Sequence, residues 1–250
     1  MSTLSWLLKD FVDCFRESLL ALLFDLGGIA AGALLYAYLS GAGRTVPFVL
    51  MLYPGILSVR GVINGIFAGN LSTGLHLGTV EPSLREPSDR LRELCALVAT
   101  LTLLGGSLVA ALVSIVSLGV LSTSPLAALD VLLTTLATMD ALLLLVSPLT
   151  VVVAFYSFRV GLDPDKVLYL VMSTLADPIV TGCYAGVIGW LHTLAGRALL
   201  VGFTAVFTAT QLALLYLLRA GEVLQRVAGG VRGHDPPCYA DLRPDGAVPG

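Results

Sequence analysis

The sequence has few charged residues. Asp, Glu, Lys and Arg make up 12% of its 250 residues, and the only lysines are Lys9 and Lys166. A soluble domain carries about 25% charged residues, so this chain cannot cover a water-facing surface of its size. The same scarcity leaves no basic block that would bind nucleic acid. Apolar residues make up 56% of the chain, which indicates an integral membrane protein surrounded by the lipid bilayer.

Cysteine is also scarce, and the signatures of several enzyme classes are missing. The four cysteines (Cys14, Cys95, Cys183 and Cys238) are far apart, so neither a disulfide framework nor a zinc site is predicted. There is no H-E-x-x-H and no G-x-S-x-G motif, which argues against a metalloprotease or a serine hydrolase. An intramembrane aspartyl protease would need its aspartates in contexts that this sequence lacks. We therefore expect a protein that is not an enzyme.

Apolar runs predict six membrane spans, at about residues 18–40, 46–69, 92–121, 126–157, 167–191 and 197–219. Each run is long enough for a helix to cross a hydrocarbon core about 30 Å thick. Unbroken apolar runs of this length favour helices, which satisfy their own backbone hydrogen bonds in lipid. We predict an all-α polytopic helical bundle of five to six transmembrane helices, because only a short turn separates the last two runs.

The segments outside these runs are short. Residues 1–17 are amphipathic and lack the features of a cleaved signal peptide, so we expect them at the cytoplasmic interface. Residues 18–219 form the predicted transmembrane domain. Residues 220–250 are rich in Gly, Pro and charge, and we expect them to form a disordered cytoplasmic tail.

Lys and Arg are distributed unequally over the loops. With the N-terminus inside, eleven of them fall in cytoplasmic segments and only Arg44 and Arg197 fall in outside loops. Short cytoplasmic loops carry an excess of positive charge. We therefore predict a multi-pass protein of the cytoplasmic membrane with both termini in the cytoplasm.

Two aspartates lie deep within predicted spans. Asp177 follows Lys166 by a rise of roughly 16 Å, which places it near the midplane of the bilayer. Asp140 follows Asp130, at the expected outer interface, by a similar interval. Intramembrane carboxylates are costly unless they pair, face water or hold an ion. Two at similar depth suit a hard divalent cation such as Mg²⁺, although each could instead be protonated or hydrogen-bonded to a neighbouring helix.

Other polar residues lie within or beside the second span. Asn64 and Asn70 are candidate oxygen ligands, although asparagines also join helices by hydrogen bonds. Asp25 and Arg60 lie at similar depths and could form a structural ion pair, with a direct role in a pore as the alternative. Pro178 follows Asp177 and would release the carbonyl of Thr174, which could join an ion site or be covered by a neighbouring helix.

Two motifs resemble the membrane domain of MgtE-type magnesium transporters, and most closely their solute carrier family 41 relatives. The first runs from Pro54 through Arg60-Gly61 to Ala68 and Leu71-Ser72-Thr73, ending at Gly78. The second is Asp163-Pro164-Asp165, followed by Asp177 at the interval that the family shows. Asn64 stands where the family has an acidic residue, and Asn70 where it has an arginine. The resemblance covers roughly residues 18–190.

This resemblance implies a cation pathway along the axis of a homodimer, with Asp177 as its central Mg²⁺ ligand. We therefore predict transport of Mg²⁺ or a similar divalent cation across the cytoplasmic membrane by residues 18–219. The predicted metal-binding residues are Asp177, Asp140, Asn64 and Asn70. Both a channel and a carrier coupled to Na⁺ or H⁺ fit this prediction. The alternative is a non-transporting membrane scaffold, in which the intramembrane polar groups only hold helices together.

Overall fold

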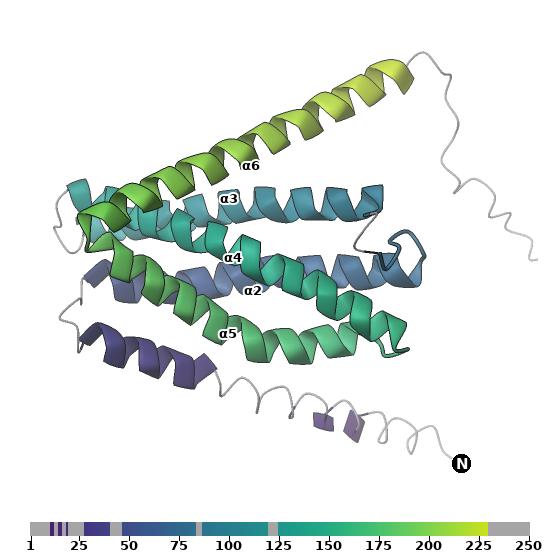
Figure 1. Cartoon of the computed structure of the whole chain (residues 1–250), viewed down its shortest axis with the longest axis horizontal. Coiled ribbons are helices and arrows are strands. Elements are labelled where there is room, and N and C mark those ends of the chain that lie inside the picture. The colour runs from purple at the N-terminus through teal and green to yellow at the C-terminus, as the bar shows by residue number, and fades with distance from the viewer. Residues whose placement is uncertain are drawn as a thin grey trace, which may run out of the picture.

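A computed structural model of the chain shows a bundle of long helices. It describes residues 11–12, 15–16, 19, 28–40, 47–83, 87–119 and 125–229. The helices are α2 (Pro47–His76), α3 (Asp89–Gly119), α4 (Pro125–Arg159), α5 (Pro164–Leu191) and α6 (Leu194–Gly229), as Figure 1 shows. A shorter apolar helix, Gly28–Ser40, precedes them. No strand occurs among the described residues, which confirms the predicted all-α class.

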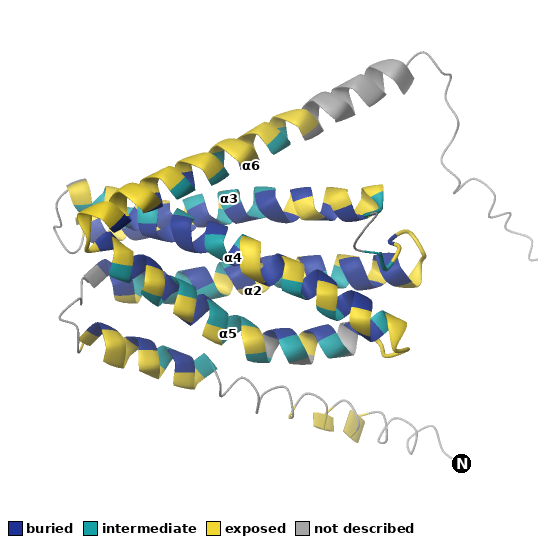
Figure 2. Cartoon of the chain, in the orientation of Figure 1, coloured by how far each residue is buried: buried dark blue, intermediate teal, exposed yellow. Residues whose placement is uncertain are grey.

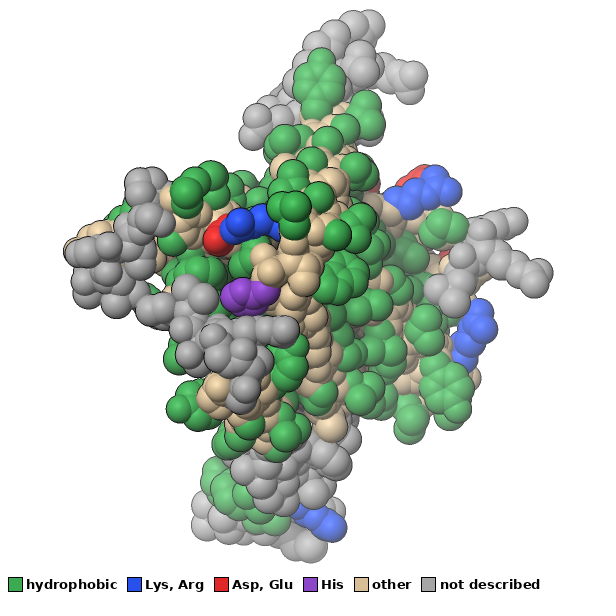
Figure 3. All heavy atoms as spheres, turned by 60° about the vertical axis from the view of Figure 1, so that its left-hand side comes forward, with side chains coloured by type: hydrophobic (Ala, Val, Ile, Leu, Met, Phe, Trp, Pro, Cys, Tyr) green, Lys and Arg blue, Asp and Glu red, His purple; other side chains and the backbone are tan. Residues whose placement is uncertain are grey.

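Within the described ranges, five helices are long and apolar enough to cross a membrane: α2, α3, α4, α5 and α6. This confirms the expected polytopic bundle of five to six spans. The first predicted span, 18–40, is described as a helix from Gly28 onward. Figure 3 shows a face on which hydrophobic side chains predominate and charged groups are few among the described residues, as a surface against lipid requires.

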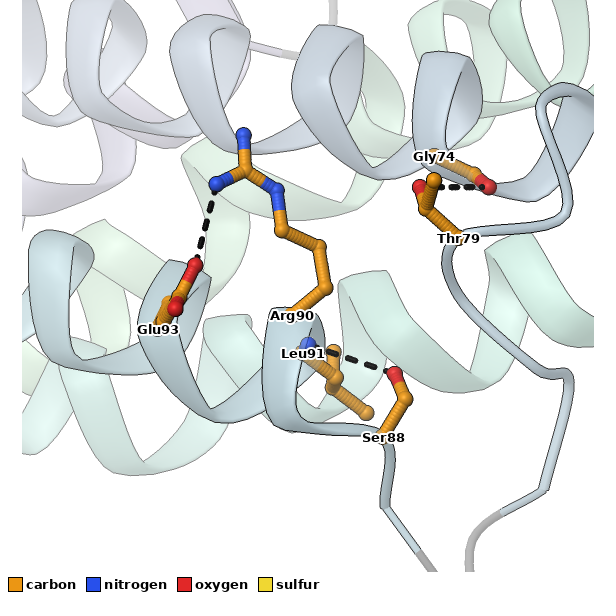
Figure 4. A network of polar contacts seen from close by, with 6 residues as sticks. All are labelled: Gly74, Thr79, Ser88, Arg90, Leu91 and Glu93. Carbon is orange, nitrogen blue, oxygen red and sulfur yellow. Dashed lines mark hydrogen bonds and ion pairs between the residues drawn. The ribbon is translucent and has the colours of Figure 1, made fainter. Parts of the chain in front are cut away.

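Proline and a polar cap mark where these helices begin. Pro47, Pro125 and Pro164 are the first residues of α2, α4 and α5, where the missing proline N–H has no helical partner to lose. Before α3, the Ser88 hydroxyl accepts a hydrogen bond from the backbone N–H of Leu91 at 3.3 Å (Figure 4). Local chemistry, and not the apolar pattern alone, therefore sets the helix starts.

Two glycine turns lie at the same end of the bundle. Gly78 after α2 and Gly161 after α4 have φ angles of 70° and 80°, a left-handed conformation that glycine adopts without a Cβ clash. The Arg159 side chain donates a hydrogen bond to the carbonyl of Pro82, which joins the two connections. The α2–α3 and α4–α5 connections therefore share one end, and the α3–α4 and α5–α6 connections share the other (Figure 1).

The α4 helix is at the centre of the bundle. It packs against α2, α3, α5 and α6. The α6 helix, by contrast, diverges from the bundle toward its C-terminal end (Figure 1), and most of its described side chains are exposed (Figure 2). The positions of α2, α3, α5 and α6 relative to one another therefore depend on their common contact with α4.

Two helices extend beyond the predicted spans. α2 continues past residue 69 to His76, because polar side chains there bond to their own helix. The Asn70 amide donates to the carbonyl of Ile66, and the Thr73 hydroxyl donates to the carbonyl of Gly69, both at 2.8 Å. α6 continues to Gly229, into the segment expected to form the tail. The predicted interfacial role of residues 1–17 falls mainly outside the described residues, as does the predicted disorder beyond Gly229.

Candidate functional site

Two tyrosines hold α2 against α5. The Tyr53 hydroxyl on α2 and the Thr181 hydroxyl on α5 share a hydrogen bond of 2.7 Å. One turn farther along, the fully buried Tyr184 donates to the backbone carbonyl of Val49 at 2.6 Å. These bonds set the register of the two antiparallel helices, and therefore which residues of α2 lie opposite the middle of α5.

Asp177 lies in the middle of α5, one turn before Thr181. The Thr181 hydroxyl donates to the backbone carbonyl of Asp177 at 2.7 Å, so one residue contacts both Tyr53 and the Asp177 backbone. The carboxylate lies against Gly28 of the Gly28–Ser40 helix, where a Cβ atom would overlap with Asp177 Oδ2. Three segments, α2, α5 and the Gly28–Ser40 helix, therefore meet around this carboxylate.

A cavity of about 400 Å³ lies between α2 and α5. Its polar side chains include Arg60 and Asn64 from α2 and Asp177 from α5. The remaining lining is apolar or glycine, and comprises Leu57, Gly61, Gly65, Ala68, Gly69, Leu168, Tyr169, Met172, Ala176 and Val180. Gly61, Gly65 and Gly69 follow one another at helical spacing, and a Cβ on any of them would meet no atom within 4 Å. Glycine on this face of α2 keeps the space open.

Arg60 and Asn64 of α2 form hydrogen bonds with side chains of α4. The Thr150 hydroxyl donates to Asn64 Oδ1 at 3.0 Å, and it also lies 2.8 Å from the carbonyl of Val146 on its own helix. Arg60 is 2% exposed, and its Nη2 donates to the Ser147 hydroxyl at 3.3 Å. Among the described residues, Arg60 Nε and Nη1 have no hydrogen-bond partner. One guanidinium with unsatisfied donors therefore borders the same cavity as the Asp177 carboxylate.

The structure brings Asn64 and Asp177 to one cavity, but not the other two predicted ligands. Asp140 is 2% exposed and lies on α4, where Gln211 of α6 donates to it; neither residue lines the cavity. Asn70 is exposed on α2, and its amide bonds to the carbonyl of Ile66. No group of three or more His, Cys, Asp and Glu side chains in the described ranges is placed to hold a metal ion. The expected Asp25–Arg60 pair cannot be placed, because Asp25 lies outside the described residues.

Sequence reasoning missed Gly28, Thr150 and Gln211. Gly28 has no side chain, and a glycine carries no signal of what it contacts. Thr150 is one of several threonines in apolar runs, which commonly bond to their own helix, as Thr135 does to the Val131 carbonyl. Gln211 did carry a signal, because an amide within an otherwise apolar span requires a polar partner.

The cavity contains two kinds of oxygen group that bind hard cations. Asp177 provides an anionic oxygen, and the Asn64 amide oxygen has a second lone pair beyond the one that accepts from Thr150. Mg²⁺ keeps several of its waters and binds through one or two carboxylates, so few protein ligands suffice. At roughly 30 Å³ per water, a cavity of this volume has room for a partly hydrated ion.

A bundle of apolar helices with a carboxylate in the middle of one helix, beside a cavity, is an arrangement typical of membrane transport proteins. The particular family follows from the sequence, because residues 53–187 match the model of the MgtE family of divalent cation transporters. This match covers more than half of the chain, so the chain belongs to the MgtE family, as predicted. No curated protein and no solved structure matches the chain. The closer resemblance to solute carrier family 41 stays a prediction.

Proposed function

We propose that this chain moves Mg²⁺, or a similar divalent cation, through the cavity between α2 and α5, with Asp177 as the central ligand. The observation that carries this proposal is the convergence of Asp177 and Asn64 on one cavity inside the region that matches the transporter family. Asn64 would bind the ion through its amide oxygen or through a retained water. Metal binding by Asp140 and Asn70 stays a separate prediction, since neither residue lines the cavity.

We further propose that the transport path lies between two copies of the chain. Asp177 and Arg60 carry opposite charges, so the cavity of one copy offers little net negative charge to a divalent cation. A second Asp177 from a two-fold related copy would double the carboxylates at the ion, and the two would repel each other when the site is empty. The exposed glycine face of α2, with Gly61 and Gly65, would let the two copies approach closely.

The proposed location is the cytoplasmic membrane, with the α2–α3 and α4–α5 connections inside. That end of the bundle carries Arg90, Arg92 and Arg159, whereas the other end has Arg197, which is ion-paired with Asp130. The distribution agrees with the rule that positive residues gather on the cytoplasmic side. It supports an orientation with both termini in the cytoplasm.

The test is Mg²⁺ flux into liposomes that contain the purified chain, compared with Asp177→Asn. We expect flux from the wild type and almost none from the variant, because the amide keeps the shape and removes the charge. Asp89→Asn is the matched control, since Asp89 is exposed at the start of α3 and pairs only with Arg92 in the described part of the chain. Equal flux from wild type and Asp177→Asn would refute the role of Asp177. A folded wild type without flux of any divalent cation would favour the scaffold alternative.

A Na⁺ or pH gradient, imposed in the same liposomes, separates the two transport mechanisms. A channel passes Mg²⁺ down its own gradient at a rate that the second gradient does not change. A coupled carrier accelerates or reverses Mg²⁺ movement when the second gradient is reversed. The same measurement on Asp177→Asn shows whether any residual flux uses the same path.

A further inference from the structure

A groove of about 730 Å³ runs between α4 and α6, and it shares no residue with the cavity that Asp177 lines. Its walls are mostly apolar and include Leu129 and Leu133 of α4 and Ala205 and Ala209 of α6. In the described part of the chain, α6 does not pack against α2. The groove is therefore on a different part of the bundle from the proposed transport path.

The groove is as deep as one leaflet of a bilayer. It begins at the end of the bundle where α4 and α6 both start (Figure 1). It extends about 15 Å along α4, from Leu126 to Leu136, and about 22 Å along α6, from Arg197 to Leu212. Half of a hydrocarbon core is about 15 Å thick, so the groove reaches from one interface to about the middle of the membrane.

The lining of the groove fits a hydrocarbon chain. Leu129 is 61% exposed, and Ala205 and Ala209 are exposed as well, so apolar walls face outward along its length. The buried Thr204 donates its hydroxyl to the carbonyl of Leu200 on its own helix, which leaves it no free donor for a polar ligand. Apolar spaces of this kind exclude water. An acyl chain is the component of the bilayer that matches such walls.

The mouth of the groove carries an ion pair. Arg197 Nη2 donates to Asp130 Oδ1, both residues line the groove, and their side chains are 47% and 25% exposed. A guanidinium has five N–H donors, so Arg197 can bind a phosphate while it keeps its bond to Asp130. Asp130 has a second oxygen that can accept from a cation. The pair therefore offers one positive and one negative group at the interface, beside an apolar groove.

We propose that this groove binds one phospholipid whose zwitterionic head group ends in a primary ammonium, as in phosphatidylethanolamine. The phosphate is bound by Arg197, the ammonium is bound by Asp130, and one acyl chain lies between α4 and α6. In the orientation proposed above, the lipid belongs to the outer leaflet. The inference stands independently of the role proposed for Asp177.

Charge complementarity selects this head group over the other common kinds. The Arg197–Asp130 pair is neutral, so an anionic lipid that gains a contact with Arg197 also meets the negative charge of Asp130. A glycerol head group has no positive group for Asp130. A choline head group has the same charge as ethanolamine, but its quaternary nitrogen has no N–H to donate. Only the primary ammonium forms a charge-assisted hydrogen bond with the carboxylate.

Native mass spectrometry of the full chain tests the proposal. The chain in detergent is mixed with equal amounts of palmitoyl-oleoyl phosphatidylethanolamine, phosphatidylcholine and phosphatidylglycerol. We expect one phosphatidylethanolamine to be retained per chain, about tenfold more tightly than the other two, because each of those lacks one charge-assisted hydrogen bond. Equal retention of the three lipids would mean ordinary bilayer lipid only and would overturn the proposal, as would stronger retention of phosphatidylglycerol.

Variants of the ion pair separate the two head-group contacts. Asp130→Asn should remove most of the preference for phosphatidylethanolamine over phosphatidylcholine, since the ammonium then meets no negative charge. Arg197→Gln should weaken retention of all three lipids, since all three carry the phosphate. The assignment of the two contacts is wrong if Asp130→Asn keeps the full preference, or if Arg197→Gln retains lipid as the wild type does.

A tryptophan in the groove tests the acyl-chain contact. Ala205→Trp places a large ring between α4 and α6 and should abolish retention of all three lipids. Ala111→Trp is the matched control and should retain lipid, because Ala111 is exposed on α3 and does not line the groove. Unchanged retention in Ala205→Trp would overturn the proposal. So would a lipid-free dimer that only Ala205→Trp splits, because the groove would then hold a second copy of the chain.

Thermal unfolding gives a second readout that does not depend on the mass spectrometer. A ligand that binds only the folded chain raises its Tm. Phosphatidylethanolamine added to the detergent should therefore raise the Tm of wild type and Ala111→Trp by several degrees, and more than phosphatidylcholine does. It should leave the Tm of Ala205→Trp nearly unchanged. An equal gain in Ala205→Trp would show that the lipid acts elsewhere.

Discussion

Gly28 lies directly against the carboxylate of Asp177, with no room for a side chain between them. A Cβ on residue 28 would overlap with Asp177 Oδ2 and would also come within 3.1 Å of its Cγ. The helix that precedes α2 therefore forms part of the surroundings of the proposed ion ligand. The position of the Asp177 side chain depends on a residue that carries no functional group.

We predict that Gly28→Ala displaces this carboxylate and reduces Mg²⁺ flux. The clash falls on the end of the Asp177 side chain, which moves aside, and a loss of about 1.4 kcal/mol in ion binding would lower flux about tenfold. Gly32→Ala, one turn later, is the control, because its Cβ would meet the Tyr53 ring at an ordinary 3.7 Å. Flux is measured in liposomes at equal protein content. Similar flux in both variants would show that the contact with Gly28 does not position Asp177.

The hydrogen bond from Thr150 to Asn64 gives a second prediction. Thr150→Val keeps the side-chain volume and removes the donor that orients the Asn64 oxygen. A net hydrogen bond contributes about 0.5–1.5 kcal/mol, so the apparent affinity for Mg²⁺ should fall by about two- to tenfold.

Thr135→Val is the control for this change. Thr135 is equally buried on α4, and among the described residues its hydroxyl bonds only to the carbonyl of Val131 on the same helix. The dependence of flux on Mg²⁺ concentration gives the apparent affinity of each variant for Mg²⁺. An unchanged affinity for Mg²⁺ in Thr150→Val, or an equal loss in both variants, would show that Asn64 does not take part in ion binding.

Gly105 and Gly106, which are adjacent on α3, should respond very differently to substitution by alanine. A Cβ on Gly105 would come within 2.5 Å of Val59 Cγ1 on α2, whereas a Cβ on Gly106 would lie 3.4 Å from Leu136 and Met139. Gly105→Ala should destabilise the protein by about 1–3 kcal/mol, because the short, branched Val59 side chain cannot move aside. Gly106→Ala should be close to neutral. Thermal unfolding in detergent compares the two, and a smaller Tm loss in Gly105→Ala than in Gly106→Ala would refute this packing of α2 on α3.

The hydroxyl pair between α2 and α5 should contribute measurably to stability. Tyr53→Phe removes the bond to Thr181 and leaves the ring contact with Tyr184, whose centroid is 5.7 Å away. We expect a loss of about 0.5–1.5 kcal/mol in the free energy of unfolding. Tyr216→Phe on α6 is the control, because that side chain is 73% exposed. Equal stability of Tyr53→Phe and wild type would argue against this bond.

The helices were predictable because lipid imposes a simple condition on the sequence. Apolar runs near 126–157 and 167–191 correspond to α4 (Pro125–Arg159) and α5 (Pro164–Leu191) within a few residues. The ends of the helices were less predictable, since they depend on single residues such as Pro125 or Gly161. α2 extends to His76 because polar side chains there bond to carbonyls of their own helix. A prediction from apolar runs ends the helix where such polar side chains begin.

The site was predictable in depth but not in direction. Counting residues from an interface placed Asp140 and Asp177 near the middle of their spans, because each residue adds a fixed rise. The same count does not say which way a side chain points. In a soluble protein, the polar face of a helix points to water, so the sequence shows the direction of each side chain. Here the lipid and the protein interior are both apolar, so the sequence does not distinguish the two faces. Asp140 therefore points toward α6 at a similar depth, away from the cavity that Asp177 lines.

The central position of α4 has a mechanical consequence. One helix carries both Thr150, which bonds to Asn64, and Asp140, which bonds to Gln211, and the two residues are about 15 Å apart along its axis, with Pro148 between them. A shift or rotation of α4 would pull on both bonds at once. We therefore expect a change at either bond to influence the other, and thermodynamic linkage would make that influence mutual.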